Sequence, residues 1–116
     1  MTTTAVPAVQ ALCCSPVLSQ ELPEQESVDL AAALKVLAEP TRLRLISLIR
    51  SAPGGRAVTR DLVERLHVAQ PTVSHHLGLL HQAGFVRREH SGRETWYSVE
   101  PDAFATVSQL LQPSRT

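Results

Sequence analysis

Gln70-Pro-Thr-Val-Ser-His-His-Leu77, followed by Ala83-Gly-Phe-Val86 and His90-Ser-Gly-Arg93, is the stretch of sequence that decides the fold. The proline after Gln70 suits the first turn of a helix, where its missing N–H is not needed. Apolar residues then recur at helical spacing, at Val73, Leu77 and Leu80. Gly84 is the residue type that most often ends a helix in a left-handed conformation. We therefore expect a helix that stops at this glycine.

Two strands are expected after that helix. Residues 85–90 and 94–99 are rich in residues that favour strands, and Ser91-Gly92 between them suits a tight turn. The stretch before Gln70 is expected to hold a short helix over 60–66, capped by Thr59, and a turn over 67–69. His67 is less suited than glycine to the left-handed conformation that such a turn needs. Two helices, a turn and a hairpin in this order predict a winged helix-turn-helix.

Further helices are expected on either side of this unit. Ser27 is the expected N-cap of a helix that runs to Leu37, and Pro40 is expected to begin the next helix, which ends at a loop over 53–55. The inner face of that second helix is expected to hold Leu43, Ile46 and Ile49, broadened by Leu45 and Leu48. After Pro101, a last amphipathic helix is predicted from Phe104, Val107, Leu110 and Leu111.

The fold class that follows is mainly α with a small β-wing. Residues 27–112 are expected to form one winged helix-turn-helix domain for DNA binding and dimerisation. Residues 1–26 are expected to be a flexible N-terminal arm, because they are rich in Thr, Pro, Gln and Glu and contain three prolines. With 116 residues, the chain has room for only a modest core.

Charge is unevenly distributed along a chain whose net charge is zero. Residues 40–99 hold nine Arg and four acidic residues, whereas residues 1–39 hold one Lys and five acidic residues. A basic middle suits contact with phosphates. No apolar run approaches the ~20 residues of a membrane span, and the N-terminus lacks an export signal. We therefore expect a cytoplasmic protein with no membrane partner, in which the only cysteines, Cys13 and Cys14, are reduced.

The outward face of the second helix of the helix-turn-helix is the predicted contact with duplex DNA. At 100° per residue, His75 points directly away from the apolar stripe, and Gln70 lies at the N-terminal tip that usually meets the bases. His76 points more toward the protein and is expected to play a supporting role, whereas His81 and His90 are expected to be solvated. The predicted DNA-binding residues are Gln70, Thr72, Ser74, His75 and Arg93. One helix and one hairpin bury little surface, so two copies on half-sites ~34 Å apart are expected.

These segments resemble the ArsR/SmtB family of metal- and metalloid-responsive bacterial repressors. The matching motifs span about residues 28–112 and are Leu37-Ala-Glu-Pro-Thr-Arg-Leu-Arg-Leu45, Gln70–Leu77, Ala83–Val86, Gly92-Arg93 and Trp96-Tyr97. The resemblance implies a homodimer built on the first and last long helices. It also implies a protein that is not an enzyme and that holds operator DNA until an inducer binds.

Cys13 and Cys14 are the candidate metal- or metalloid-binding residues. Members of the family often place sensing ligands in the helix before the turn or in the last helix, but residues 58–62 hold no cysteine and residues 102–112 hold no histidine. The sequence Leu12-Cys-Cys-Ser15 looks like the N-terminal cysteine pair of actinobacterial arsenite sensors. Some of those sensors take a third thiolate from the loop where this chain has Gly54-Gly55.

Two thiolates favour soft, thiophilic ions and make a poor four-ligand zinc site. Trivalent arsenic or antimony, As(III) or Sb(III), takes three ligands, so the third would be hydroxide, a small thiol, or the methyl group already present in methylarsenite. The expected inducer is therefore a trivalent metalloid, with methylarsenite better suited than arsenite, and no cofactor is expected to be required. Three alternatives stay open at this point: a thiol redox-sensing regulator, a winged-helix regulator with no metalloid ligand, and a thiol enzyme, the least favoured because Cys13 has no Arg or His near it in sequence.

Overall fold

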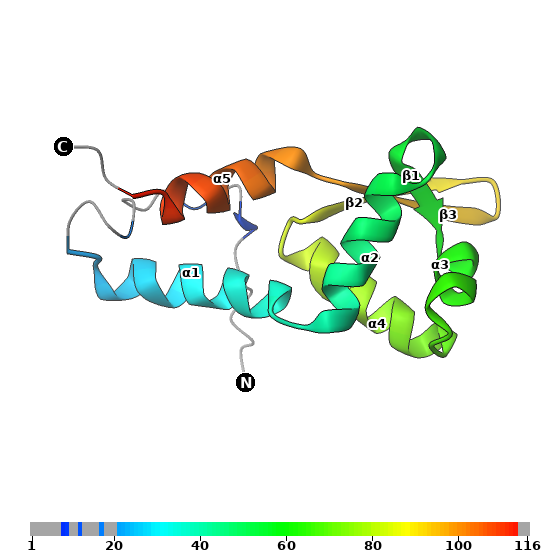
Figure 1. Ribbon diagram of the computed structural model, residues 1–116, viewed down its shortest axis with the longest axis horizontal. Coiled ribbons are helices and arrows are strands. Elements are labelled where there is room, and N and C mark those ends of the chain that lie inside the picture. The colour runs from blue at the N-terminus through cyan, green and yellow to red at the C-terminus, as the bar shows by residue number, and fades with distance from the viewer. Residues whose placement is uncertain (1–7, 10–11, 13–16, 18–20, 114–116) are drawn as a thin grey trace.

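The computed structural model describes residues 8–9, 12, 17 and 21–113. Its elements in chain order are α1 (Glu24–Leu37), α2 (Pro40–Ser51), the 3₁₀ turn η2 (Pro53–Gly55), β1 (Arg56–Val58), α3 (Thr59–Leu66), α4 (Gln70–Gln82), β2 (Val86–Ser91), β3 (Glu94–Val99) and α5 (Pro101–Leu111). Helices α2, α3 and α4 pack beside the sheet, the β2–β3 hairpin projects from one end, and α1 and α5 extend toward the other (Figure 1). The predicted winged helix-turn-helix is confirmed.

The sheet has three antiparallel strands in the order β1-β3-β2. The expected hairpin is present, with Val86 opposite Val99 at its base and Ser91 opposite Glu94 at its tip. Gly92 has a φ of 64°, which explains the need for glycine at this turn. The third strand, β1, was not predicted. With only three residues it shows no alternation in the sequence, and its pairing with β3 is what defines it.

The core is formed around α4. Val73, Leu77 and Leu80 have no exposed surface, as the helical spacing predicted, and Phe85 just after the helix is equally buried. Helix α2 contributes Leu45 and Ile49, whereas Ile46 and Leu48 are half-buried. The expectation that Leu43 lies on the inner face was wrong, because 52% of this residue is exposed. The buried face of α2 is thus rotated toward the Leu45 side.

Two of the expected helix caps were also wrong. Helix α1 begins at Glu24, after Pro23, and the hydroxyl of Ser27 donates to the carbonyl of Glu24 inside the first turn. Helix α3 includes Thr59, and Val58 before it gives no side-chain cap. A hydroxyl can bond within a helical turn as well as cap it, so a serine or threonine alone does not fix where a helix begins.

Both turns that frame α4 follow the sequence prediction. His67 ends α3 in a left-handed conformation, with φ 57° and ψ 38°, and its N–H donates to Val63 O at 3.0 Å. Gly84 follows α4 with a φ of 88°, and Phe85 N–H donates to Leu80 O at 2.9 Å. These turns set the direction in which the chain enters and leaves α4.

Three of the described residues before α1, Val9, Leu12 and Val17, contact the domain. Val9 is fully buried in the core, and its N–H donates to Ala83 O at 2.8 Å. Leu12 packs against the same core, and Val17 N–H donates to Leu110 O at 2.9 Å. These contacts attach parts of the segment 1–26 to the end of α4 and to α5, while the flexibility expected of that segment stays a prediction. Across the described part of the chain, no helix is long and apolar enough to cross a lipid bilayer.

Candidate nucleic-acid interface

The outer face of α4 carries a group of polar side chains. Gln70, Thr72 and His75 are exposed, and Ser74 is half-buried. The amide Nε2 of Gln70 donates to Ser74 Oγ at 2.8 Å, one helical turn further on. The buried stripe of α4 faces the core, so this polar face is directed away from it. All four side chains can donate or accept hydrogen bonds, which is what contact with base edges and phosphates requires.

His76 faces the protein instead. Its side chain is only 13% exposed, and its Nδ1 accepts a hydrogen bond of 3.1 Å from Arg42 Nε. The rings of His75 and His76 are 5.9 Å apart. The inward direction predicted for His76 is therefore confirmed, and its partner lies 34 residues away and could not be named from the sequence.

The wing, residues 86–99, brings arginines to the same end of the molecule as α3. Arg93 at its tip is exposed, and no hydrogen bond or ion pair engages it among the described residues. By contrast, Arg60 of α3 pairs with Glu94 at 3.1 Å, and Arg87 pairs with Glu100. The Arg60–Glu94 pair joins α3 to the wing tip, although an exposed pair contributes only ~0.2–1 kcal/mol. Arg93 thus leaves its guanidinium available at the tip of the wing.

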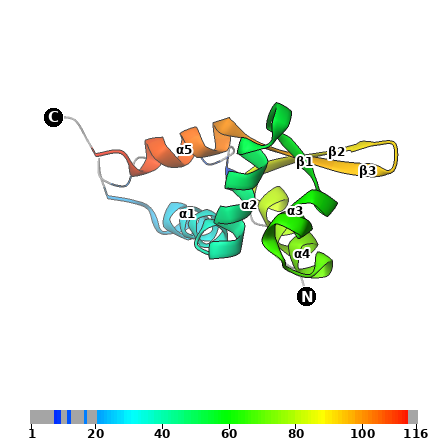
Figure 2. The same cartoon turned by 45° about the vertical axis from the view of Figure 1, so that its right-hand side comes forward.

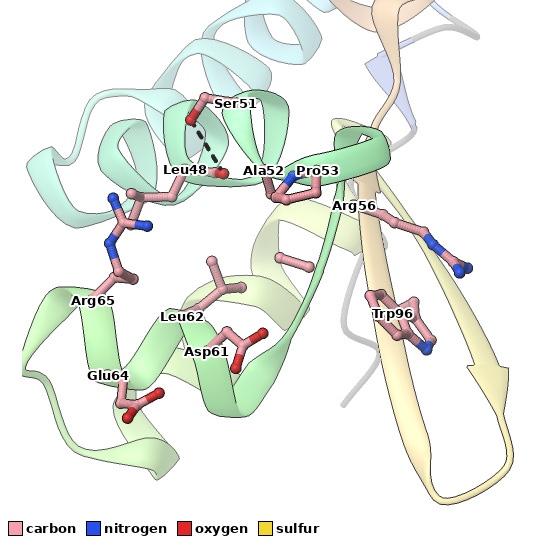
Figure 3. Close-up of a pocket in the computed structure, with 11 residues that line it drawn as sticks. Leu48, Ser51, Ala52, Pro53, Arg56, Asp61, Leu62, Glu64, Arg65 and Trp96 are labelled. Atoms are coloured by element: carbon pink, nitrogen blue, oxygen red, sulfur yellow. Dashed lines mark hydrogen bonds between the residues drawn. The ribbon is translucent and has the colours of Figure 1, made fainter.

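A cavity of about 430 Å³ lies between α3, the end of α2 and Trp96 of the wing. Asp61 and Leu62 of α3 line one side of it, and Trp96 of β3 lines another (Figure 3). The guanidinium of Arg56 lies over the Trp96 ring, 4.2 Å from its centre, a contact that contributes ~0.5–1 kcal/mol at an exposed site. Since Asp61 is also 3.7 Å from Arg60, its carboxylate is already partly compensated. The contact of Arg56 with Trp96 helps to fix the wing against β1.

The remaining histidine of α4 is in a different environment. His81 is half-buried, so the expectation that it is solvated was wrong. Burial lowers the pKa of His81, and the positive charge of Arg88 lowers it further. His90 on the wing is exposed as expected, and its Nδ1 lies 3.0 Å from Thr95 Oγ1.

The candidate metalloid ligands Cys13 and Cys14 lie outside the described residues. Within the described ranges, no group of three or more His, Cys, Asp or Glu side chains is placed to hold a metal ion. The positions on either side that the structure does describe are Leu12 and Val17. Both contact the domain, Leu12 at the core and Val17 at the end of α5.

Residues 39–88 match the family described as bacterial regulatory protein, arsR family. The chain is 41% identical over 86 residues to the HTH-type transcriptional repressor SmtB of Mycobacterium tuberculosis, covering 73% of this chain and 62% of that protein. It is 30% identical over 83 residues to the arsenical resistance operon repressor of Staphylococcus xylosus, covering 72% and 77% respectively. Among solved structures, a possible transcriptional regulator for arsenical resistance superposes with a TM-score of 0.62 and 33% identity, over 68% of this chain and 79% of that one.

Proposed function

The chain belongs to the ArsR family of bacterial regulatory proteins, and we propose that it is a repressor that binds operator DNA as a homodimer and is released by a trivalent metalloid. The observation that carries the proposal is the exposed polar face of α4, together with the exposed Arg93 at the tip of the wing. A helix of this kind fits the major groove, and a hairpin beside it reaches the backbone or the minor groove. Helix α4 is called the recognition helix from here on.

Each predicted DNA contact has a chemical role. Gln70 can pair with adenine through its amide, and the pair contributes ~1–3 kcal/mol of discrimination when bidentate. Its hydrogen bond to Ser74 holds the amide in one orientation before DNA binds, which lowers the entropy lost on binding. Thr72 and His75 can contact bases or phosphates, and Arg93 a phosphate.

Dimerisation would use the end of the molecule opposite the wing. Helices α1 and α5 extend together from that end in both views (Figures 1 and 2). Val28 on α1 and Leu111 on α5 expose 55% and 45% of their surface, which is high for large apolar side chains. Pairing these helices about a two-fold axis would cover both residues and present two recognition helices to a pseudo-palindromic operator.

The proposed inducer site is the pair Cys13 and Cys14. Two adjacent thiolates suit trivalent arsenic or antimony, and binding displaces thiol protons. The hydrogen bonds of Val9 and Val17, on either side of the pair, support a connection between this site and the recognition helix. Val9 is hydrogen-bonded to the residue that ends the recognition helix, and Val17 to α5. A metalloid bound between these two contacts would strain both of them. Shifting the protein from the DNA-binding state to the released state needs ~5.5 kcal/mol of difference in metalloid affinity between the two states.

DNA binding is tested by fluorescence anisotropy with labelled duplexes from upstream of the gene, at two salt concentrations. The wild-type protein is expected to bind one segment with nanomolar affinity, and affinity should fall steeply with salt. His75→Ala should weaken binding to that segment more than binding to random DNA, whereas Arg93→Ala should weaken both by a similar factor. The matched control is His90→Ala, an exposed wing histidine without a proposed contact. Equal affinity for all duplexes would exclude an operator-binding repressor.

Inducer binding is tested by titrating the complex with arsenite, antimonite and methylarsenite. The double variant Cys13→Ser, Cys14→Ser should bind the operator as the wild type does but should not be released. Methylarsenite is expected to act at the lowest concentration. Release that persists in the double variant would exclude the cysteine pair as the sensing site. Release by peroxide, together with a disulfide on a non-reducing gel, would favour the redox-sensing alternative.

A further inference from the structure

Arg42 of α2 contacts the end of α1, the residue before α2 and the middle of α4. It is neither a proposed DNA contact nor a proposed sensing ligand. Its backbone N–H donates to Glu39 Oε2 at 3.0 Å, and its Nη1 donates to Val36 O in the last turn of α1 at 2.9 Å. Its Nε donates to His76 Nδ1 of the recognition helix at 3.1 Å. One guanidinium thereby connects the end of α1 with the middle of α4.

The chemistry of this contact fixes the state of the His76 ring. A guanidinium only donates hydrogen bonds, so Nδ1 must be the accepting nitrogen and Nε2 carries the hydrogen. Glu39 Oε2 lies 3.9 Å from the same Nδ1, and the His76 side chain is 13% exposed. A hydrogen bond from a charged donor in such a place is stronger and more directional than a surface contact.

The contact with Arg42 matters for DNA binding because of where His76 lies in the recognition helix. It follows His75, the residue proposed to face the DNA, and the two rings are 5.9 Å apart. Elsewhere α4 packs on the core through Val73, Leu77 and Leu80, whose hydrophobic contribution has no preferred direction of its own. A hydrogen bond does have one. The contact with Arg42 therefore adds a directional restraint on the angle between α1 and α4 to the packing of the core.

We propose that Arg42 and His76 form a positioning link that fixes the recognition helix relative to α1, and thereby sets the half-site spacing of the preferred operator. The inference rests on the proposed function, in which α1 is part of the dimer interface. In that arrangement, a change in the angle between α1 and α4 moves the two recognition helices toward or away from each other. Neither residue needs to touch DNA for this effect.

The test compares His76→Asn with His76→Gln. In asparagine the amide oxygen lies close to the place of Nδ1, whereas in glutamine it lies one bond further out, and the two residues are otherwise alike in polarity. Both are titrated by anisotropy against the duplex that the wild type selects, and against versions with one or two base pairs added or removed between the half-sites. Arg42→Lys, which keeps the charge but lacks Nε, is the second variant, and circular dichroism monitors folding.

The expected result is that His76→Asn keeps the spacing preference of the wild type. His76→Gln and Arg42→Lys should bind the preferred duplex about tenfold more weakly and the altered duplexes nearly unchanged, so the preference is lost. Three results would overturn the link: no effect of either variant, an equal loss on every spacing, or a His76→Asn variant as impaired as His76→Gln. A wild type that binds none of the duplexes would instead refute the proposed function, whereas binding without these differences refutes the link alone.

Discussion

Val9→Ala is expected to destabilise the protein although Val9 lies in a segment expected from the sequence to be a flexible arm. The side chain has no exposed surface and belongs to the main core. Shortening it removes two carbons, at ~0.8 kcal/mol each, and the cavity left behind brings the total to about 2–3 kcal/mol. For a domain with a total stability of ~5–15 kcal/mol, this is a substantial fraction.

The measurement is urea unfolding followed by circular dichroism at one fixed protomer concentration, because the stability of a dimer depends on concentration. With a slope near ~1.5 kcal/mol per molar urea, the midpoint of Val9→Ala should fall by about 1.5 M. The matched control is Ala8→Ser, one residue earlier and exposed, which should stay within ~0.5 kcal/mol of the wild type. If both variants unfold like the wild type, Val9 is not part of the core.

Three further predictions concern two turn residues, His67 and Gly92, and the protonation of His81 in α4. His67→Gly should raise the free energy of unfolding by ~0.5–1 kcal/mol in thermal or urea unfolding, since glycine removes left-handed strain of ~1–2 kcal/mol but adds entropy to the unfolded chain; a destabilised variant would contradict this. Gly92→Ala should destabilise by ~1–2 kcal/mol through backbone strain alone, because no atom lies within 4 Å of the added carbon, and hydrogen exchange should accelerate in the wing first; unchanged exchange there would count against it. His81 has a folded-state pKa below 6.5, so the folded state binds fewer protons than the unfolded state, and stability should fall as the pH drops below about 6.5. His81→Gln should show a shallower fall than the wild type over this range, and parallel pH profiles would refute the assignment.

Most of the candidate interface could be predicted from spacing. The positions of Gln70, Thr72 and His75 relative to the buried stripe follow from helix geometry, and the structure exposes all three. The inward direction of His76 followed from the same geometry. What spacing could not supply were its partners, because Arg42 lies 34 residues earlier in the chain.

Local chemistry in the sequence determined the turns, the helix periods and the hairpin. Gly84, Gly92 and the two helices around His67 are where short-range steric rules placed them, since φ preferences and side-chain periodicity act within a few residues.

Only the tertiary structure decided which faces met. It paired β1 with β3, buried Val9 against the end of α4, left Leu43 exposed, and brought Arg60 to Glu94. An amphipathic pattern states that a face is buried but not what covers it, because that depends on how whole elements pack. The angle of the recognition helix is a property of that packing.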